Sequence, residues 1–187
     1  YIKNEDPLHP KTESEKFISY LKENKKILDV GCGPGRDAKI FTNKGFEVTG
    51  IDLSEKMIEA AKNRVKRAKF EVMDLCNLKF EEYSFDGMWA NASFLHIPKK
   101  DISQTLNQAY KILRKNGIFY VSVKEGEGEA VVRDKRYDNA EKFFSYFSKY
   151  EIEEELKKAR FQIIESYIDK VQASYQTNPW IRIFCKK

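Results

Sequence analysis

The sequence has few cysteines and histidines, and its cysteines form no recognisable pattern. Cys32, Cys76 and Cys185 are widely spaced, and they include no C-x-x-C pair that a pair of histidines could complete. A disulfide framework and a zinc site both need regular spacing, so we expect three reduced thiols and no bound metal.

Long apolar runs are also lacking. No stretch reaches the roughly 18 consecutive apolar residues of a membrane-spanning helix, and the N-terminal region lacks the apolar core of a signal peptide. We therefore expect a soluble, cytoplasmic protein that does not enter a membrane. The chain begins at Tyr1 rather than at a methionine, so we expect further sequence to precede it.

Charge of one sign is not concentrated anywhere in the chain. The 34 Lys and Arg residues are interspersed with 29 Asp and Glu residues, and the net charge of +5 is spread over many segments. This distribution favours solubility over a nucleic-acid-binding groove. A chain of 187 residues that is 41% apolar can bury one substantial core, so we expect a single domain over residues 1–187.

Short apolar runs alternate with segments of helical periodicity along most of the chain. A first helix is expected at residues 13–24, where Thr12 and Glu15 form a capping box. The strands that we expect after it are KKILDV, FEVTGI, AKFEVMD, SFDGMWAN and GIFYVSV. Strands that alternate with helices form a mostly parallel sheet with right-handed crossovers and with helices on both faces.

The C-terminal part of the chain departs from this alternation. After an expected helix that begins at Ser148, the strands FQIIESYIDKV and WIRIFCKK are joined by a short polar loop, which predicts an antiparallel hairpin. The expected fold is therefore α/β: a Rossmann-like, doubly wound, mostly parallel seven-stranded sheet with helices on both faces and a C-terminal antiparallel hairpin. Residues 125–147 show no sustained period, and we expect them to form an irregular loop on the substrate side.

A glycine turn follows the first expected strand in the stretch ILDVGCGPGRDA. Gly31, Gly33 and Gly35 occupy every second position, whereas a dinucleotide fingerprint would place its third glycine where Arg36 stands. This departure argues against a pyrophosphate ligand. We expect a ligand that lies against the backbone of the turn and places a compact anionic end at the start of the next helix.

Acidic residues stand at the ends of the first three expected strands. Asp52 can accept two hydrogen bonds from a ribose diol, a feature common to nicotinamide and adenosyl ligands. Asp74 can accept a hydrogen bond from the exocyclic amine of an adenine, and Asp29 can brace the glycine turn or bind an ammonium group. An apolar surface for the adenine ring would come from Leu53, Met57 and Leu75.

Several ordered motifs resemble those of the class I S-adenosylmethionine-dependent methyltransferases, over nearly the whole chain. LDVGCGPG is similar to their first motif, TGIDLSEKMIEAA to the second, EVMDL to the third and FDGMWANASFLHIP to the fourth. Within that family the chain looks most similar to the small type 11 and tellurite-resistance-like groups. The resemblance implies S-adenosyl-L-methionine as cofactor, S-adenosyl-L-homocysteine as product, and a cofactor site lined by Asp29, Gly31, Cys32, Gly33, Asp52, Leu53, Met57, Asp74, Leu75 and Asn91.

The expected activity is transfer of the sulfonium methyl group to an O, N or S atom of a small-molecule acceptor by in-line displacement. His96 follows the fourth expected strand, where its imidazole can act as a general base, or can instead cap a helix or bond a backbone carbonyl. The substrate-side candidates are Arg136, Tyr137 and Phe144, although a solvated loop and core packing would also explain these residues.

Two other classes of function remain open at this point. One is a module that binds the cofactor without methyl transfer, and the other is a nicotinamide-dependent oxidoreductase. We expect a monomer or a homodimer with no nucleic-acid partner.

Overall fold

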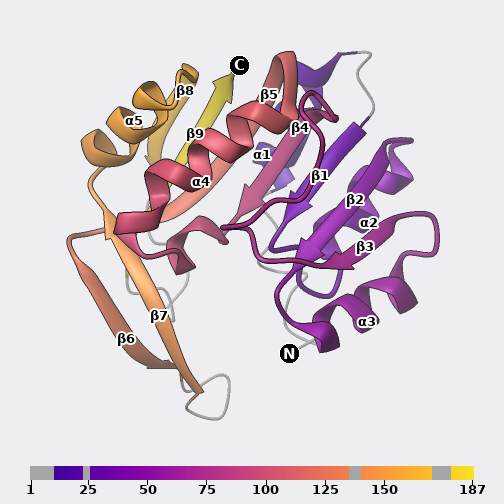
Figure 1. The fold of residues 1–187 in the computed structure, drawn as a ribbon, viewed down its shortest axis with the longest axis horizontal. Coiled ribbons are helices and arrows are strands. Elements are labelled where there is room, and N and C mark those ends of the chain that lie inside the picture. Colours follow the sequence, from indigo (N-terminus) through magenta and orange to yellow (C-terminus); the bar gives the residue numbers. More distant parts are fainter. Residues whose placement is uncertain (1–10, 23–25, 135–139, 170–177) are drawn as a thin grey trace.

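The computed structural model describes residues 11–22, 26–134, 140–169 and 178–187. Within these ranges the chain forms one mixed sheet of nine strands, with helices on both of its faces (Figure 1). The expected doubly wound α/β fold is therefore confirmed.

Five parallel strands form the centre of the sheet. They are β1 (Lys26–Val30), β2 (Glu47–Asp52), β3 (Lys69–Val72), β4 (Phe85–Asn91) and β5 (Leu113–Glu125). Their order across the sheet is β3-β2-β1-β4-β5, so the chain reverses direction of winding between β1 and β4. Every residue of β4 before Asn91 is buried, as is typical of a parallel strand that is covered on both faces. Ligands of such folds bind at the carboxyl ends of the strands beside this reversal.

Two antiparallel strands continue the sheet beyond β5. They are β8 (Gln162–Asp169) and β9 (Trp180–Lys186). β9 lies between β5 and β8 and runs antiparallel to both, which confirms the expected C-terminal hairpin. Because Lys124 pairs with Trp180, the start of β9 lies beside the carboxyl end of β5.

The helices divide between the two faces of the sheet. They are α1 (Lys11–Leu21), α2 (Arg36–Asn43), α3 (Glu55–Arg64), α4 (Lys99–Ile112) and α5 (Lys149–Lys158). The first three share one hydrophobic cluster with the sheet, and the last two share another. Compared with the expected helix at residues 13–24, α1 begins two residues earlier, at Lys11, and ends at Leu21.

Serine side chains begin two of these helices, and the one at Ser148 was expected from the sequence. The Ser54 hydroxyl accepts a hydrogen bond from the backbone N–H of Met57 at the start of α3. The Ser148 hydroxyl accepts one from the backbone N–H of Glu151 at the start of α5. Each hydroxyl satisfies an N–H group that has no partner within its helix.

Residues 125–147 are not the irregular loop that the sequence suggested, because they contain a two-stranded hairpin. Its strands β6 (Glu129–Asp134) and β7 (Ala140–Phe147) pair antiparallel and raise the strand count from the expected seven to nine. β7 pairs with β5 only at Lys124 and Glu125, and Figure 1 shows the hairpin extending beyond the sheet. Residues 129–133 are all exposed, so no alternation of buried and exposed positions marked β6 in the sequence.

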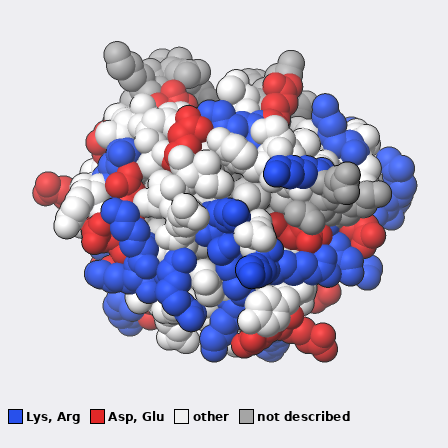
Figure 2. Space-filling model, turned by 90° about the horizontal axis from the view of Figure 1, so that it is seen from above, with Lys and Arg blue, Asp and Glu red and all other residues white. Residues whose placement is uncertain are grey.

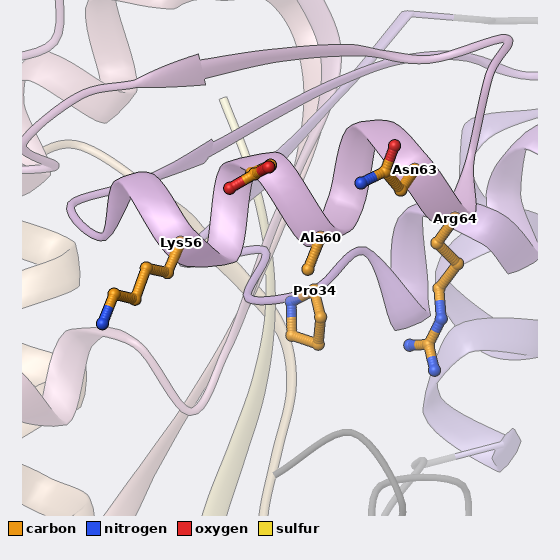
Figure 3. A pocket seen from close by; sticks show the side chains of 6 residues that line it. Pro34, Lys56, Ala60, Asn63 and Arg64 are labelled. Carbon is orange, nitrogen blue, oxygen red and sulfur yellow. The ribbon is translucent and has the colours of Figure 1, made fainter.

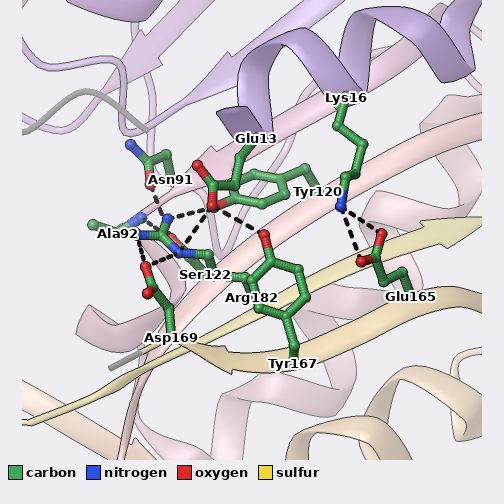
Figure 4. Close-up of polar contacts among 10 residues, drawn as sticks. All are labelled: Glu13, Lys16, Asn91, Ala92, Tyr120, Ser122, Glu165, Tyr167, Asp169 and Arg182. Carbon is green, nitrogen blue, oxygen red and sulfur yellow. Dashed lines mark hydrogen bonds and ion pairs between the residues drawn. The ribbon is translucent and has the colours of Figure 1, made fainter. Parts of the chain in front are cut away.

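A polar cluster fastens α1 to the sheet (Figure 4). Arg182 of β9 donates from Nη1 to the Tyr120 hydroxyl at 3.0 Å, and its Nη2 lies 2.8 Å from Oδ2 of Asp169. Glu13 of α1 accepts a hydrogen bond from the Tyr167 hydroxyl at 2.9 Å, and its Oε1 lies 3.4 Å from Nε of Arg182. The cluster holds α1 against the face of the sheet that α2 and α3 also cover.

The surface carries charges of both signs. Figure 2 shows the face at which the parallel strands begin, where Lys and Arg side chains gather in the lower part of the view with Asp and Glu side chains among them. None of the helices in the described ranges is long and apolar enough to cross a membrane.

Candidate functional site

The glycine turn connects β1 to α2 and has a backbone that side chains disfavour. The φ angles of Gly31, Gly33 and Gly35 are 68°, 51° and 79°, in the left-handed region. A Cβ atom on Gly31 would lie 2.6 Å from Cβ of Ser93, whereas one on Gly33 would meet no atom of the described residues within 4 Å. The turn therefore packs against the end of β4 at Gly31 and leaves open space at Gly33.

The backbone N–H groups of the turn are largely used within the chain. Gly31 and Cys32 donate to the carbonyl of Ile51 at 2.8 and 2.9 Å, and Gly35 donates to the carbonyl of Cys32 at 3.0 Å. Gly33 donates to Oδ2 of Asp52 at 3.0 Å. The N–H groups of the turn itself are therefore already satisfied within the chain.

Asp52 ends β2 directly beside the turn. Its Oδ1 accepts a hydrogen bond from the backbone N–H of Ser54 at 2.9 Å, while Oδ2 accepts the one from Gly33. A carboxylate oxygen has two lone pairs, so each oxygen of this half-buried side chain can accept one bond more. Two remaining acceptor positions on one carboxylate suit a ribose diol.

Asp29 lies inside β1 as a buried acid with an unused oxygen. Its side chain is 2% exposed, and Oδ2 has no hydrogen-bond partner among the described residues. Burial raises the pKa of Asp29 well above its usual value, and the neighbouring charge of Asp37 raises it further. An ammonium group placed at Oδ2 would supply the missing partner and would favour the ionised carboxylate.

Asp37 is a neighbour of the candidate site that sequence reasoning missed. It lies in the first turn of α2, where Arg36 donates to it from Nε at 2.6 Å, and it accepts hydrogen bonds from Trp89 Nε1 at 2.8 Å and Asn91 Nδ2 at 3.2 Å. The side chain thus ties α2 to the end of β4. An acid in the first turn after a glycine turn was the available signal.

Asn91, expected in the cofactor site, is held on both sides by the fold. Its Nδ2 binds Asp37, and its Oδ1 accepts a hydrogen bond from the Ser122 hydroxyl at 3.0 Å (Figure 4). The next residue, Ala92, has a left-handed φ of 57° and donates its backbone N–H to the same hydroxyl at 2.9 Å. Such strained backbone is concentrated at functional sites, which makes the end of β4 a candidate site in its own right.

The residues expected around an adenine follow β2 and β3 in the chain. Leu53 is 72% exposed, and Met57 and Leu75 are half-buried. Asp74 is exposed two residues beyond the end of β3, and its Oδ1 accepts a hydrogen bond from the backbone N–H of Cys76 at 2.8 Å. A Leu side chain that is mostly exposed beside Asp52 suits an apolar ring as partner.

Cys32 is a packed residue of the turn. It is buried, and its Sγ lies 3.5 Å from the carbonyl oxygen of Gly33. Burial raises the pKa of this thiol well above its usual value, and the carboxylates of Asp29 and Asp52 raise it further. A thiol with a raised pKa is a poor nucleophile, so its contribution to a cofactor site would be its small size.

His96 lies in a short 3-10 helix, Phe94–His96, just after β4. Its Nδ1 is 2.8 Å from the carbonyl oxygen of Phe143 in β7. Desolvation lowers the pKa of His96 and the nearby charges of Lys142 and Lys124 lower it further, whereas the hydrogen bond with the Phe143 carbonyl and the charge of Asp52 raise it. The net shift is downward, so the imidazole is neutral near pH 7.

Of the three substrate-side candidates, the structure describes only Phe144. Phe144 is buried, with its ring centroid 5.0 Å from that of His96 and 4.3 Å from Nζ of Lys124. Arg136 and Tyr137 lie outside the described residues. The structure therefore brings one of the three candidates to the carboxyl edge of the sheet, where it packs as a core residue beneath the histidine.

A separate groove follows the outer side of α3 (Figure 3). It has a volume of about 400 Å³ and is lined by Pro34, Lys56, Glu59, Ala60, Asn63 and Arg64. None of these side chains belongs to the expected cofactor set, so this groove is not our candidate site.

The open space at Gly33 leads to a first prediction. Gly33→Ala would place a methyl group where a ligand would lie against the turn, so we expect S-adenosylmethionine to bind about tenfold or more weakly, as measured by calorimetry. Gly45→Ala is a matched control, because Gly45 also has a left-handed φ, of 91°, and open space around it. Both variants should lose about 1–2 kcal/mol of stability. Equal affinity in both variants would contradict this placement of the ligand.

Comparison with known proteins shows similarity to methyltransferases. Residues 27–117 match a family profile described as "Methyltransferase domain". Methyltransferase GfsG from Streptomyces halstedii is 35% identical over 99 residues, which cover 49% of this chain and 35% of that protein. The matching segment thus spans about a third of the length of this relative.

Solved structures resemble the chain over nearly its whole length. An S-adenosylmethionine-dependent methyltransferase from Methanosarcina mazei has a TM-score of 0.82 at 22% identity, covering 96% of this chain and 97% of that one. The 1,6-didemethyltoxoflavin-N1-methyltransferase of Burkholderia thailandensis has a TM-score of 0.79 at 25% identity, covering 98% of this chain and 79% of that one. The latter structure contains 1,6-didemethyltoxoflavin and S-adenosylhomocysteine.

Proposed function

We propose that this protein is a class I S-adenosylmethionine-dependent methyltransferase, because residues 27–117 match the methyltransferase domain profile and the chain has the fold of a solved S-adenosylmethionine-dependent methyltransferase. It would move the sulfonium methyl group of S-adenosylmethionine to an O, N or S atom of a small-molecule acceptor. We propose further that it acts in the cytoplasm, as a monomer or a homodimer.

One observation supports this proposal more strongly than the others. Three features converge at the carboxyl end of β1 and β2: the unpartnered, buried Oδ2 of Asp29, the open space at Gly33 and the remaining acceptor positions of Asp52. Their chemistry fits the ammonium group, the backbone-facing side and the ribose of one ligand. Leu53, Met57, Asp74 and Leu75 lie beyond Asp52 in the chain, where they would meet the adenine.

The residues of the chain would act chiefly by positioning. When bound, S-adenosylmethionine supplies a methyl group that is already activated, so no covalent enzyme intermediate is needed. Asp29 and Asp52 would hold the two ends of the cofactor, and orientation of this kind can contribute on the order of 7–11 kcal/mol. His96 would accept the proton that an acidic acceptor loses, because its neutral imidazole has a free lone pair.

A panel of acceptors tests the activity. Candidate carboxylic acids, phenols, amines, thiols and nitrogen heterocycles would each be incubated with the protein and S-adenosylmethionine, and release of S-adenosylhomocysteine would be measured. We expect release that depends on one acceptor class. Binding of the cofactor without release for any class would instead favour a module that binds S-adenosylmethionine and transfers nothing.

The buried carboxyl of Asp29 leads to a prediction about pH. Because its pKa is raised, a fraction of Asp29 is protonated before binding, and an ammonium group would drive that proton off. We therefore expect S-adenosylmethionine to bind more tightly as pH rises through the raised pKa, with protons released on binding. Calorimetry in two buffers of different ionisation enthalpy measures that release.

Asp29→Asn is the control for this titration. It keeps the shape of the side chain but carries no titrating proton, so its binding should be weaker and should release fewer protons than the wild-type protein. Proton release that is the same in both proteins would refute the contact between Asp29 and the amino group.

A further inference from the structure

The contact between His96 and the β6–β7 hairpin determines which nitrogen of the imidazole carries the proton. A backbone carbonyl oxygen can only accept a hydrogen bond, so the 2.8 Å contact with Phe143 requires the proton of a neutral His96 to sit on Nδ1. The lone pair is then on Nε2. A ring in the other tautomer would lose this bond and would present N–H in place of a base.

The hairpin needs other anchors to hold that carbonyl in place. β7 pairs with β5 only at Lys124 and Glu125, and the remainder of the hairpin extends past the sheet (Figure 1). A ribbon of two strands is marginally stable without packing partners. The buried side chains of Phe144 and Phe147 anchor β7 in the core, and hydrogen bonds to the segment between His96 and α4 add to this anchoring.

Ser145 and Glu129 supply these contacts from opposite strands of the hairpin. Ser145 is fully buried, and its hydroxyl donates to the carbonyl of Ile97, the residue after His96, at 2.6 Å. Oε1 of Glu129 accepts a hydrogen bond from the backbone N–H of Lys99 at 2.7 Å and lies 3.3 Å from Oγ of Ser145.

Glu129 also serves as a cap that α4 otherwise lacks. The residue before the helix is Pro98, whose side chain makes no capping hydrogen bond. The carboxylate of Glu129 supplies an acceptor to the first N–H of α4, where the positive end of the helix dipole favours an anion. The same carboxylate therefore stabilises the start of α4 and fastens the hairpin beside His96.

We propose that the β6–β7 hairpin is a positioning element, which holds His96 through Ser145, Glu129 and the Phe143 carbonyl as a base with its lone pair on Nε2. This inference rests on the proposed function, since a base is needed only if an acceptor loses a proton. Nε2 takes the proton as the acceptor atom bonds to the methyl carbon, while the electron pair of the breaking C–S bond stays on the sulfur of S-adenosylhomocysteine.

The charges that face His96 come from three strands. Lys142 of β7 and Lys124 of β5 oppose its protonation, whereas Asp52 of β2 favours it. Desolvation remains the first cause of the lowered pKa. A loosened hairpin would move Lys142 away, which raises the pKa of His96, but it would also release the Phe143 carbonyl, whose hydrogen bond now raises that pKa. The two effects oppose each other, so the tautomer of His96, rather than its pKa, distinguishes a loosened hairpin from an intact one.

The test needs neither cofactor nor acceptor. The chain has two histidines, so the spectrum of protein with 15N-labelled histidine contains two imidazoles, and the signals lost in His96→Gln identify His96. We expect Nε2 of His96 to show the unprotonated shift at neutral pH, and the ring to titrate below 6.5. Ser145→Ala and Glu129→Ala should increase the fraction of neutral His96 that is protonated at Nε2.

Arg133→Gln is the matched control in the same hairpin. Arg133 and Glu141 form an ion pair with side chains 74% and 60% exposed, and among the described residues neither side chain bonds to the segment that carries His96. Its spectrum should equal that of the wild-type protein. Glu129 is exposed, so Glu129→Ala keeps the test decisive if Ser145→Ala does not fold.

Kinetics with an acceptor separate this inference from the proposed function. Glu129→Ala should lower kcat on the order of tenfold to a hundredfold, with KM for S-adenosylmethionine unchanged. A wild-type His96 protonated at Nε2, or a tautomer unaffected by both variants, overturns the inference. Loss of cofactor binding in the wild-type protein would instead overturn the proposed function.

Discussion

Asp52→Ala is expected to abolish measurable binding of S-adenosylmethionine. The substitution removes the two acceptor positions that a ribose diol would use, and hydrogen bonds to a charged group contribute about 1.5–3 kcal/mol each. Loss of both corresponds to about a hundredfold or more in Kd. It also releases the N–H groups of Gly33 and Ser54, which the carboxylate now holds. Calorimetry on the purified variant measures the effect.

Glu47→Ala is the control for this prediction. Glu47 is an exposed acid at the other end of β2. Its replacement removes one negative charge from the same strand, as Asp52→Ala does, but leaves the glycine turn intact. We expect Glu47→Ala to bind S-adenosylmethionine with unchanged affinity. The affinity of Asp52→Asn should lie between those of Glu47→Ala and Asp52→Ala. Wild-type affinity in Asp52→Ala would refute the assigned ribose contact.

Trp89→Ala is expected to be the most destabilising single change among those considered. Trp89 is fully buried, stacks on Tyr120 at a ring-centroid distance of 4.0 Å, and donates from Nε1 to Asp37 at 2.8 Å. Removing a buried aromatic side chain costs about 3–5 kcal/mol. For a chain of this size that corresponds to a melting temperature lower by roughly 6–20 °C, which thermal denaturation would measure.

Two variants separate the causes of this loss. Trp89→Phe keeps most of the ring but removes the hydrogen bond to Asp37, so we expect a smaller loss of about 2 kcal/mol. Tyr150→Ala removes an aromatic ring that is 74% exposed and should change stability by less than about 0.5 kcal/mol. If Trp89→Ala and Tyr150→Ala had the same melting temperature, the contact of Trp89 with Asp37 would not stabilise the packing of α2 against β4.

The parallel strands could be predicted from the sequence because their physical signals are local. Each is a short apolar run, and the caps Ser54 and Ser148 lie where a hydroxyl can satisfy the first turn of a helix. The antiparallel end followed from a loop too short for a crossover. These features depend on a few neighbouring residues, so no tertiary contact was needed to foresee them.

The β6–β7 hairpin could not be predicted for the opposite reason. Residues 129–133 are exposed, and the hairpin is held by Ser145, Glu129 and the Phe143 carbonyl, which bind residues some 30 to 48 positions away in the chain. Such contacts leave no periodicity in the segment itself. The charged composition therefore suggested a loop where the structure has strands.

The candidate site divides in the same way. Residue type and strand ends pointed to Asp29, Asp52 and the glycines, but the sequence could not reveal that the turn amides bond to Ile51 and Asp52. Nor could it reveal that Asn91 is held between Asp37 and Ser122, because those bonds join separate elements. His96 combines a feature that could be predicted with one that could not. Its place after β4 was predicted from the sequence, whereas its tautomer depends on the contact with the hairpin.

The central claim is that the glycine turn and Asp52 form an S-adenosylmethionine site. Titration calorimetry of the wild-type protein with S-adenosylmethionine, and separately with NAD, tests it most directly. We predict saturable binding of S-adenosylmethionine at one site per chain and none of NAD. Absence of saturable heat with S-adenosylmethionine, or binding of NAD in its place, would contradict the account.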